Sequence, residues 1–307
     1  MSENKDEEKT SLINIEDLTG LSKPLEKLIE CISNGCGKLF NSLFIKKMAD
    51  SNAYEIKTLK DALGDSESEI TINRNGTIIT LKNQREKVVL DHVLDKESKK
   101  LENTSKVIQN TANILKDKES VSDEPVDKDW LTRFFRITED ISNEEMQNLW
   151  SKILADEIEK PNSYSLRTLQ VLKNISSKEA KLFTKFVNLC FKFSIDDKLR
   201  VINDKEFLSN YDINLEDMAL LEELNLVSSG LSYKIKPSIK FSFIYCDKLI
   251  FIENKSKNDI LFFVYSLTTI GQEISSIIER QFELSYAKVF SDYFKSRDNI
   301  SAYITDL

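Results

Sequence analysis

The stretch "ILADEIEKPNSYSLRTLQVL" (residues 153–172) decides the expected fold, because it contains the end of one helix and the start of the next. Apolar residues spaced three and four apart run up to Ile158, and Pro161 ends this helix because proline cannot continue it. Either Ser163 or Ser165 can cap the second helix by accepting hydrogen bonds from its first free amides. Two helices joined by so short a corner predict a helical bundle around this stretch.

Charged side chains lie on both sides of the proline corner. They are Asp156, Glu157 and Glu159 before the proline and Arg167 after it. Arg167 lies one turn into its helix and can reach back to Asp156 or Glu157, so an arginine–carboxylate pair can fix the angle between the helices. The alternative is a metal-dependent hydrolase that uses the three carboxylates. Because side chains at 156, 157 and 159 point in different directions from one helix, the pattern favours the ion-pair lock.

Sequence signals for the start of a helix also occur before and after this stretch and extend the predicted bundle in both directions. A Ser-x-x-Glu pair can form a capping box, in which both side chains satisfy free amides at the start of a helix. Such pairs occur at Ser142–Glu145 and at Ser176–Glu179. With short loops between its helices, the bundle is expected to cover residues 127–194.

Upstream, the sequence predicts one amphipathic helix over residues 23–49. Five lysines against two glutamates give it a basic face, so it can lie on an anionic membrane surface or pack between copies of the chain. Packing within the protein, with a solvated lysine face, is the plainer interpretation. The glycines beside Cys36 form a small-residue patch that another helix can approach closely. The candidate self-association or membrane residues are Leu28, Ile32, Gly35, Cys36, Gly37, Leu39, Phe40, Leu43 and Phe44.

The remaining amino-terminal part is expected to be a disordered charged tail over 1–14 and a helical or stalk-like region over 15–120. Within it, Asn75-Gly76 between two β-rich runs predicts a hairpin over 69–81, since both residues tolerate positive φ. A lone hairpin is only marginally stable. It therefore has to pack on something or pair with another copy, which is a weak indication of self-association.

The pattern changes again over residues 195–307, where a helix, a short strand, three further strands and a final helix predict a winged-helix-like module. The helix in the recognition position carries four carboxylates and neither lysine nor arginine. Carboxylates repel DNA phosphates, so the module is expected to bind protein rather than DNA. A nucleic-acid-binding regulator remains the alternative, with contacts from Lys234, Lys236 and Lys240.

Composition supports a mainly α fold: a helical bundle, a long amino-terminal amphipathic helix, a small hairpin and the winged-helix-like α+β module. A net charge of −8 over 307 residues argues against a general nucleic-acid binder. His92 is the single histidine, which excludes zinc sites built on histidine pairs. No catalytic residue, metal or cofactor is predicted. The chain is expected to be cytoplasmic or peripheral to the inner membrane, because no apolar run is long enough to cross a bilayer.

The block "DWLTRFFRITEDISNEEMQNLWSKILADEIEKPNSYSLRTLQVLKNISSKEAKLF" (residues 129–183) resembles an uncharacterised bacterial domain family and is similar in pattern to the abortive-infection alpha (Abi-alpha) proteins. The upstream stretch "GLSKPLEKLIECISNGCGKLF" resembles the amino-terminal block of the same family. No catalytic residues carry over from it. The resemblance implies a bacterial phage-defence protein. The expected function is therefore non-enzymatic defence through self-association as a homo-oligomer and recognition of a protein partner.

Overall fold

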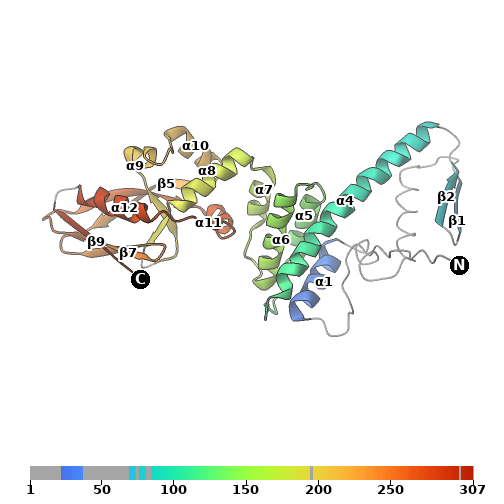
Figure 1. Ribbon diagram of the computed structural model, residues 1–307, viewed down its shortest axis with the longest axis horizontal. Helices are drawn as coiled ribbons and strands as arrows, with labels where there is room; N and C mark the ends of the chain where they lie inside the picture. The colour runs from blue at the N-terminus through green and yellow to red at the C-terminus, as the bar shows by residue number, and fades with distance from the viewer. Residues whose placement is uncertain are drawn as a thin grey trace, which may run out of the picture. The chain divides into compact units, whose positions relative to one another are not determined.

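The computed structural model describes residues 22–36, 69–73, 76–80, 84–193, 196–296 and 299–306. It divides the chain into two compact units, Met1–Ser163 and Tyr164–Leu307, which we call the helical unit and the sheet unit (Figure 1). The division falls just after the proline corner. The predicted boundaries at 127 and 195 do not coincide with it.

The helical unit is a bundle of helices with an aromatic centre. Its described helices are α1 (Lys23–Gly35), α4 (Gln84–Lys116), α5 (Lys128–Thr138) and α6 (Glu144–Glu159). In its core, the rings of Trp130 and Phe134 stack with centroids 5.1 Å apart, and Trp150 lies 5.5 Å from Phe134. The start of α6 departs from the predicted capping box: Asn143 is the cap, and its side chain accepts a hydrogen bond from the Met146 amide. Where the sequence predicts a hairpin, β1 (Glu69–Asn73) and β2 (Gly76–Thr80) pair antiparallel.

Helix α1 packs closely against α5, and Gly35 makes this approach possible. A Cβ atom at Gly35 would lie 2.5 Å from a ring carbon of Phe135 and 2.8 Å from the Cβ of Leu131. Leu28 and Ile32 are buried within the same unit. The described part of the amphipathic helix therefore uses its apolar stripe inside its own bundle. Of the predicted self-association residues, Gly37, Leu39, Phe40, Leu43 and Phe44 lie outside the described residues.

The sheet unit corrects the predicted fold class. Its seven strands form one antiparallel sheet in the order β5-β8-β4-β3-β6-β7-β9, so the fold is α+β and not mainly α with a small hairpin. The winged-helix prediction is wrong, because that module has a far smaller sheet. The strands are β3 (Phe191–Phe193), β4 (Leu199–Ile202), β5 (Val227–Ile235), β6 (Lys240–Tyr245), β7 (Lys248–Asn254), β8 (Ile260–Leu267) and β9 (Ile300–Asp306).

Helices complete the sheet unit. They are α7 (Leu166–Asn174), α8 (Ser177–Asn188), α9 (Lys205–Ser209), α10 (Leu215–Glu223), α11 (Thr269–Ser275) and α12 (Leu284–Lys295). The predicted capping box at the start of α8 is confirmed, since Ser176 and Glu179 cap each other's amides. The long helix expected after β8 is two helices, α11 and α12.

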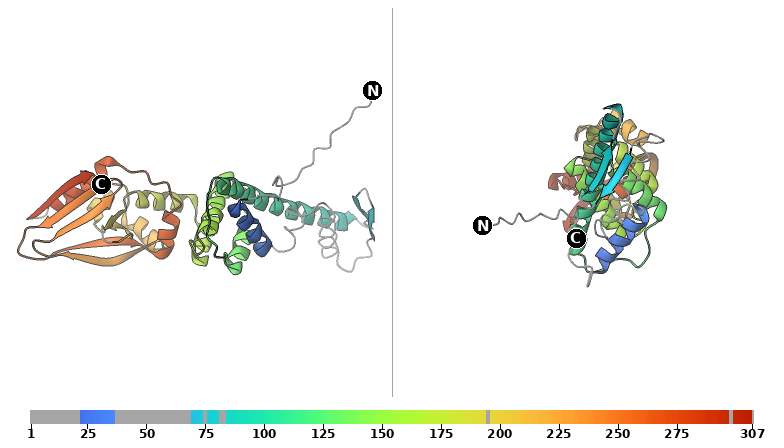
Figure 2. Two further views of the ribbon diagram at one scale, coloured as in Figure 1. Left: turned by 90° about the horizontal axis from the view of Figure 1, so that it is seen from below. Right: turned by 90° about the vertical axis from the view of Figure 1, so that its right-hand side faces the viewer.

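One face of the sheet packs against α12 through an aromatic core, and we call it the covered face. Figure 2 shows the ribbon of the sheet unit from two further sides. The strand register places Phe193, Phe243 and Ile250 on this face, and all three are buried. The ring of Phe243 lies 5.0 Å from Phe290 and 5.6 Å from Phe294, both on α12. Burial of large rings in this mutual edge-to-face arrangement stabilises the covered face.

Candidate functional site

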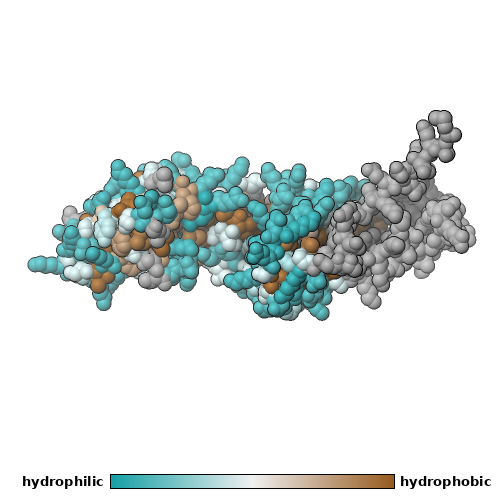
Figure 3. Space-filling model, turned by 60° about the horizontal axis from the view of Figure 1, so that its bottom comes forward, coloured by the Kyte–Doolittle hydropathy of each residue, from teal (hydrophilic) through white to brown (hydrophobic). Residues whose placement is uncertain are grey.

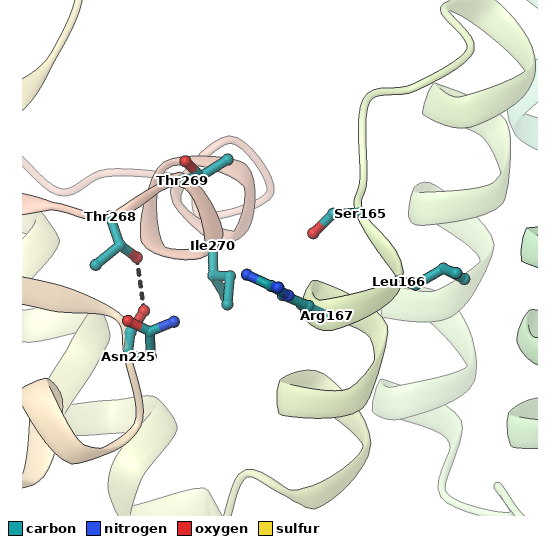
Figure 4. Close-up of a pocket in the computed structure, with 7 residues that line it drawn as sticks. All are labelled: Ser165, Leu166, Arg167, Asn225, Thr268, Thr269 and Ile270. Atoms are coloured by element: carbon teal, nitrogen blue, oxygen red, sulfur yellow. Dashed lines mark hydrogen bonds between the residues drawn. The ribbon is translucent and has the colours of Figure 1, made fainter.

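A pocket of about 590 Å³ opens within the sheet unit, between the starts of α7 and α11 (Figure 4). Five of its seven lining residues have polar side chains, and one of them carries a full charge, the guanidinium of Arg167. The lining residues are Ser165, Leu166, Arg167, Asn225, Thr268, Thr269 and Ile270. Arg167 is the exposed second residue of α7, and it points across the pocket toward Ile270 and Asn225 in Figure 4.

Two helix caps form opposite walls of the pocket. The hydroxyl of Ser165, one of the two predicted cap candidates, accepts a hydrogen bond from the Thr168 amide and so caps α7. The hydroxyl of Thr268 accepts from the Gly271 amide and donates to the Asn225 carbonyl at 2.6 Å. Gly271 is required for this packing, since a Cβ there would lie 2.0 Å from the Leu226 carbonyl oxygen.

A carboxylate already occupies the positive end of α7. The Glu273 side chain, on α11, accepts hydrogen bonds from the Ser165 amide at 2.7 Å and from the Thr168 hydroxyl. A helix amino terminus favours a negative charge, and Glu273 supplies it from within the unit. The capping groups of the pocket wall are therefore already hydrogen-bonded within the sheet unit. Arg167 is the one lining residue that carries a charge.

The three carboxylates of the proline corner do not converge in the helical unit. Glu157 is buried, and its Oε1 accepts a 2.7 Å hydrogen bond from the Asn162 amide. Glu159 instead pairs with Lys118, which lies just after α4, at 2.6 Å. Within the described part of the chain, no group of three or more His, Cys, Asp or Glu side chains could hold a metal ion. The lock from Asp156 or Glu157 to Arg167 would join residues of different units, and it stays a prediction.

The lysines assigned to nucleic-acid contact lie near acidic residues of the sheet unit. Lys234 on β5 forms an ion pair with Asp259 at 3.3 Å. Lys240 begins β6 directly opposite Glu253 on β7, and Lys236 lies in the turn between β5 and β6. This arrangement lowers the local positive potential that a phosphate backbone needs. The nucleic-acid contact stays a prediction, without the winged-helix geometry that motivated it.

Arg200, on β4, is a buried charge that we did not predict from the sequence. Its guanidinium forms two hydrogen bonds with Asp196, at 2.7 and 2.8 Å, and lies 4.3 Å above the ring of Phe193. Its Nε donates to the Tyr233 hydroxyl. Hydrogen bonding to Arg200 holds the pKa of Asp196 below its usual value. A lone arginine within the apolar run "LRVI" is the signal that could have identified it; its contacts indicate a structural role.

The second face of the sheet, which we call the open face, leaves apolar side chains accessible. The register places Phe251 on β7 directly opposite Tyr303 on β9, and their rings stack with centroids 4.9 Å apart. Tyr303 is 44% exposed, and Phe263 on β8 is 49% exposed. Leu249 and Ile244 on the same face are half-buried. Hydrophobic residues reach the surface among hydrophilic ones in Figure 3.

The chain belongs to the family described as "Protein of unknown function (DUF2806)", which matches residues 89–291. The match runs from within α4 to within α12. No curated protein and no solved structure shows a significant match to the chain. Among the described residues, no helix is long and apolar enough to cross a membrane.

Proposed function

We propose that this member of the DUF2806 family is a non-enzymatic interaction protein that associates with copies of itself through its sheet unit. The observation that carries the proposal is the row of apolar side chains on the open face, formed by the half-buried Leu249 and Phe251 on β7 and the exposed Tyr303 on the edge strand β9. When one face of an antiparallel sheet packs on a core and the other is solvated, the solvated face normally carries polar side chains. Accessible apolar side chains that gather on one face are instead typical of protein-interaction surfaces.

The chemistry of the other candidate sites supports the same choice. Glu157 and Glu159 bond to different partners, and the pocket at Arg167 is lined mainly by hydroxyls and backbone groups that already cap helices. Such a set offers neither a paired acid and base nor an activated nucleophile. Leu28 and Ile32 are buried in the helical unit, so this part of α1 does not contribute to the proposed surface.

The proposed biological setting is phage defence, together with a protein partner in the same defence system. The similarity of residues 129–183 to the Abi-alpha pattern supports this setting. The DUF2806 match does not link the chain to the Abi-alpha proteins. The test is phage infection of bacteria that express the chain. The setting predicts fewer plaques with the intact chain than with a variant that no longer associates. Equal plaque numbers would contradict the setting and leave self-association standing.

Self-association is tested by the mass of the full chain in solution across protein concentrations. We expect the mass to rise from that of one 35.4 kDa chain at low concentration to at least two chains at high concentration. Salt separates this proposal from nucleic-acid binding. Because each chain carries a net charge of −8, screening by salt should strengthen self-association, whereas salt weakens binding to phosphates.

A further inference from the structure

We propose that the partner copy pairs with the outer edge of β9, across a twofold axis at Tyr303, so that two seven-stranded sheets join into one. This inference rests on the proposed self-association and specifies its surface. It commits to a second copy of this chain, pairing antiparallel, strand against strand. The outer edge of β9 is unpaired by any strand of the described residues, lacks protection against pairing, and is complementary to itself.

The outer edge of β9 carries hydrogen-bonding groups that no strand of the described chain pairs with. β9 ends the strand order and has β7 as its one neighbour. The Asn299 carbonyl accepts from the Lys255 amide of the β7 side, and Asn254 bonds toward β6 through both its amide and its carbonyl. Backbone groups alternate direction along a strand, so these bonds fix which residues of β9 point their amide and carbonyl groups away from β7. The outward amides and carbonyls belong to Ile300, Ala302, Ile304 and Asp306.

The two edges of the sheet differ in protection. β5, at the opposite edge, has a bulge between Ser228 and Leu231, contains Gly230 at φ +88°, and carries Lys234. Bulges and lysine are devices that keep an edge strand from pairing with another chain. β9 pairs with β7 over seven consecutive residues, with no bulge, proline or lysine in its sequence "ISAYITD". It is therefore the edge suited to pairing.

A twofold axis at Tyr303 uses every outward group of β9. It places Ile300 of each copy opposite Asp306 of the other, and Ala302 opposite Ile304. These are the residues whose backbone groups point outward, so all of them fall in hydrogen-bonded pairs. Tyr303 then lies opposite itself in a non-hydrogen-bonded pair, in which side chains come closest. The two Tyr303 rings, each already stacked on Phe251, extend one aromatic row across the axis.

The position of the acidic side chain of β9 also agrees with this register. Asp306 is the acidic residue of β9, and its carboxylate forms an ion pair with Lys248 of the same chain. The register opposes Asp306 to Ile300 and keeps the two Asp306 carboxylates at opposite ends of the paired strands. Like charges directly opposite each other on paired strands would be destabilising.

The first test is a disulfide across the axis. Cα atoms in a non-hydrogen-bonded antiparallel pair lie about 4.5 Å apart, which is within the range that a disulfide accepts. In a Cys246→Ser background, which removes the exposed native thiol, Tyr303→Cys should give a covalent dimer under mild oxidation. Thr305→Cys is the matched control: it lies on the same face of β9, but the register opposes it to Ser301. It should not dimerise alone, yet should cross-link when mixed with a Ser301→Cys chain.

The second test removes the outward amide of Ile304. Proline is tolerated on an edge strand where its nitrogen faces solvent, so Ile304→Pro should leave the monomer folded. The dimer dissociation constant should rise at least about tenfold, because each interface then loses two donors. Ile304→Thr keeps the amide and a β-branched side chain, and should have a smaller effect. Circular dichroism of each variant checks that the monomer is folded.

The outcomes separate the inference from the proposed function. A dimer that Tyr303→Cys cross-links and Ile304→Pro weakens supports both. A dimer that neither change affects would overturn the β9 interface and leave self-association intact. Cross-linking by Thr305→Cys alone would overturn the register. A chain that stays monomeric at all concentrations would overturn both proposals.

Discussion

The side-chain carboxylate of Glu273 accepts a 2.7 Å hydrogen bond from the backbone amide of Ser165, which joins α11 to the cap of α7. Both residues belong to the sheet unit, although α7 follows directly after the proline corner. The contact explains why α7 groups with the sheet and not with α5 and α6.

Replacing Glu273 should therefore weaken the sheet unit. Glu273→Ala removes a charge-assisted acceptor from the Ser165 amide and the Thr168 hydroxyl, and should lower the free energy of unfolding by about 1–2 kcal/mol. Urea denaturation measures the loss. Thr168→Val, combined with Glu273→Ala in a double-mutant cycle, tests the specific contact. Additive effects of the two changes would mean that Glu273 does not act through this hydrogen bond.

Gly35→Ala should destabilise the helical unit. The added methyl group would meet Phe135 and Leu131 at distances below 3 Å, and overpacking of this kind costs about 1–3 kcal/mol. Thermal unfolding measures the change. Asn34→Ala, at a half-buried neighbouring position of the same helix, is the control and should have a smaller effect. If Gly35→Ala leaves stability unchanged but weakens self-association, then Gly35 acts between copies and not within the bundle.

The pair between Asp196 and Arg200 predicts a pH-dependent loss of stability. Hydrogen bonding to Arg200 lowers the pKa of Asp196, so its contribution is present above the unfolded pKa and is lost as pH falls through the folded pKa. Asp196→Asn should lower the melting temperature at pH 7, with a cost of about 1–2 kcal/mol after allowing for the partial exposure of Asp196. The difference between wild type and variant should shrink below about pH 4. A difference independent of pH would argue against an ionic contribution.

Thiol labelling should distinguish the four cysteines. Burial raises the pKa of Cys31 to about 12 and that of Cys190 to about 12, and it also raises the pKa of Cys36. The thiolate is the reactive form, so these three thiols should react slowly at pH 8. Cys246 is exposed and should react first. Mass spectrometry should show one fast label on the folded chain, none on Cys246→Ser, and four on the unfolded wild type. Fast labelling of Cys36 would place it outside the packed bundle.

Local signals in the sequence predicted local structure well. The Ser176–Glu179 capping box forms as expected, because both partners lie within one helical turn. The Ser142–Glu145 box is wrong, since Asn143, one residue later, is an equally good cap and takes the role. The contact of Phe191 with Phe290 of α12 could not be predicted from local pattern, because the two residues lie far apart along the chain.

The seven-stranded sheet was missed for the same physical reason. β3 and β4 have three and four residues, too few for an alternating pattern, and β4 is buried along its whole length. Their pairing is decided by β6 and β8, which lie beyond α9 and α10 in the sequence. β9 completes the sheet at its far edge, opposite β7. Long-range pairing of this kind depends on tertiary context that a local window does not contain.

The central claim, that the chain associates with itself, is tested most directly by sedimentation equilibrium of the intact protein over a wide concentration range at about 0.15 M salt. The account predicts a mass that rises from 35.4 kDa toward twice that value as concentration increases. A mass that stays at 35.4 kDa at every concentration would contradict it.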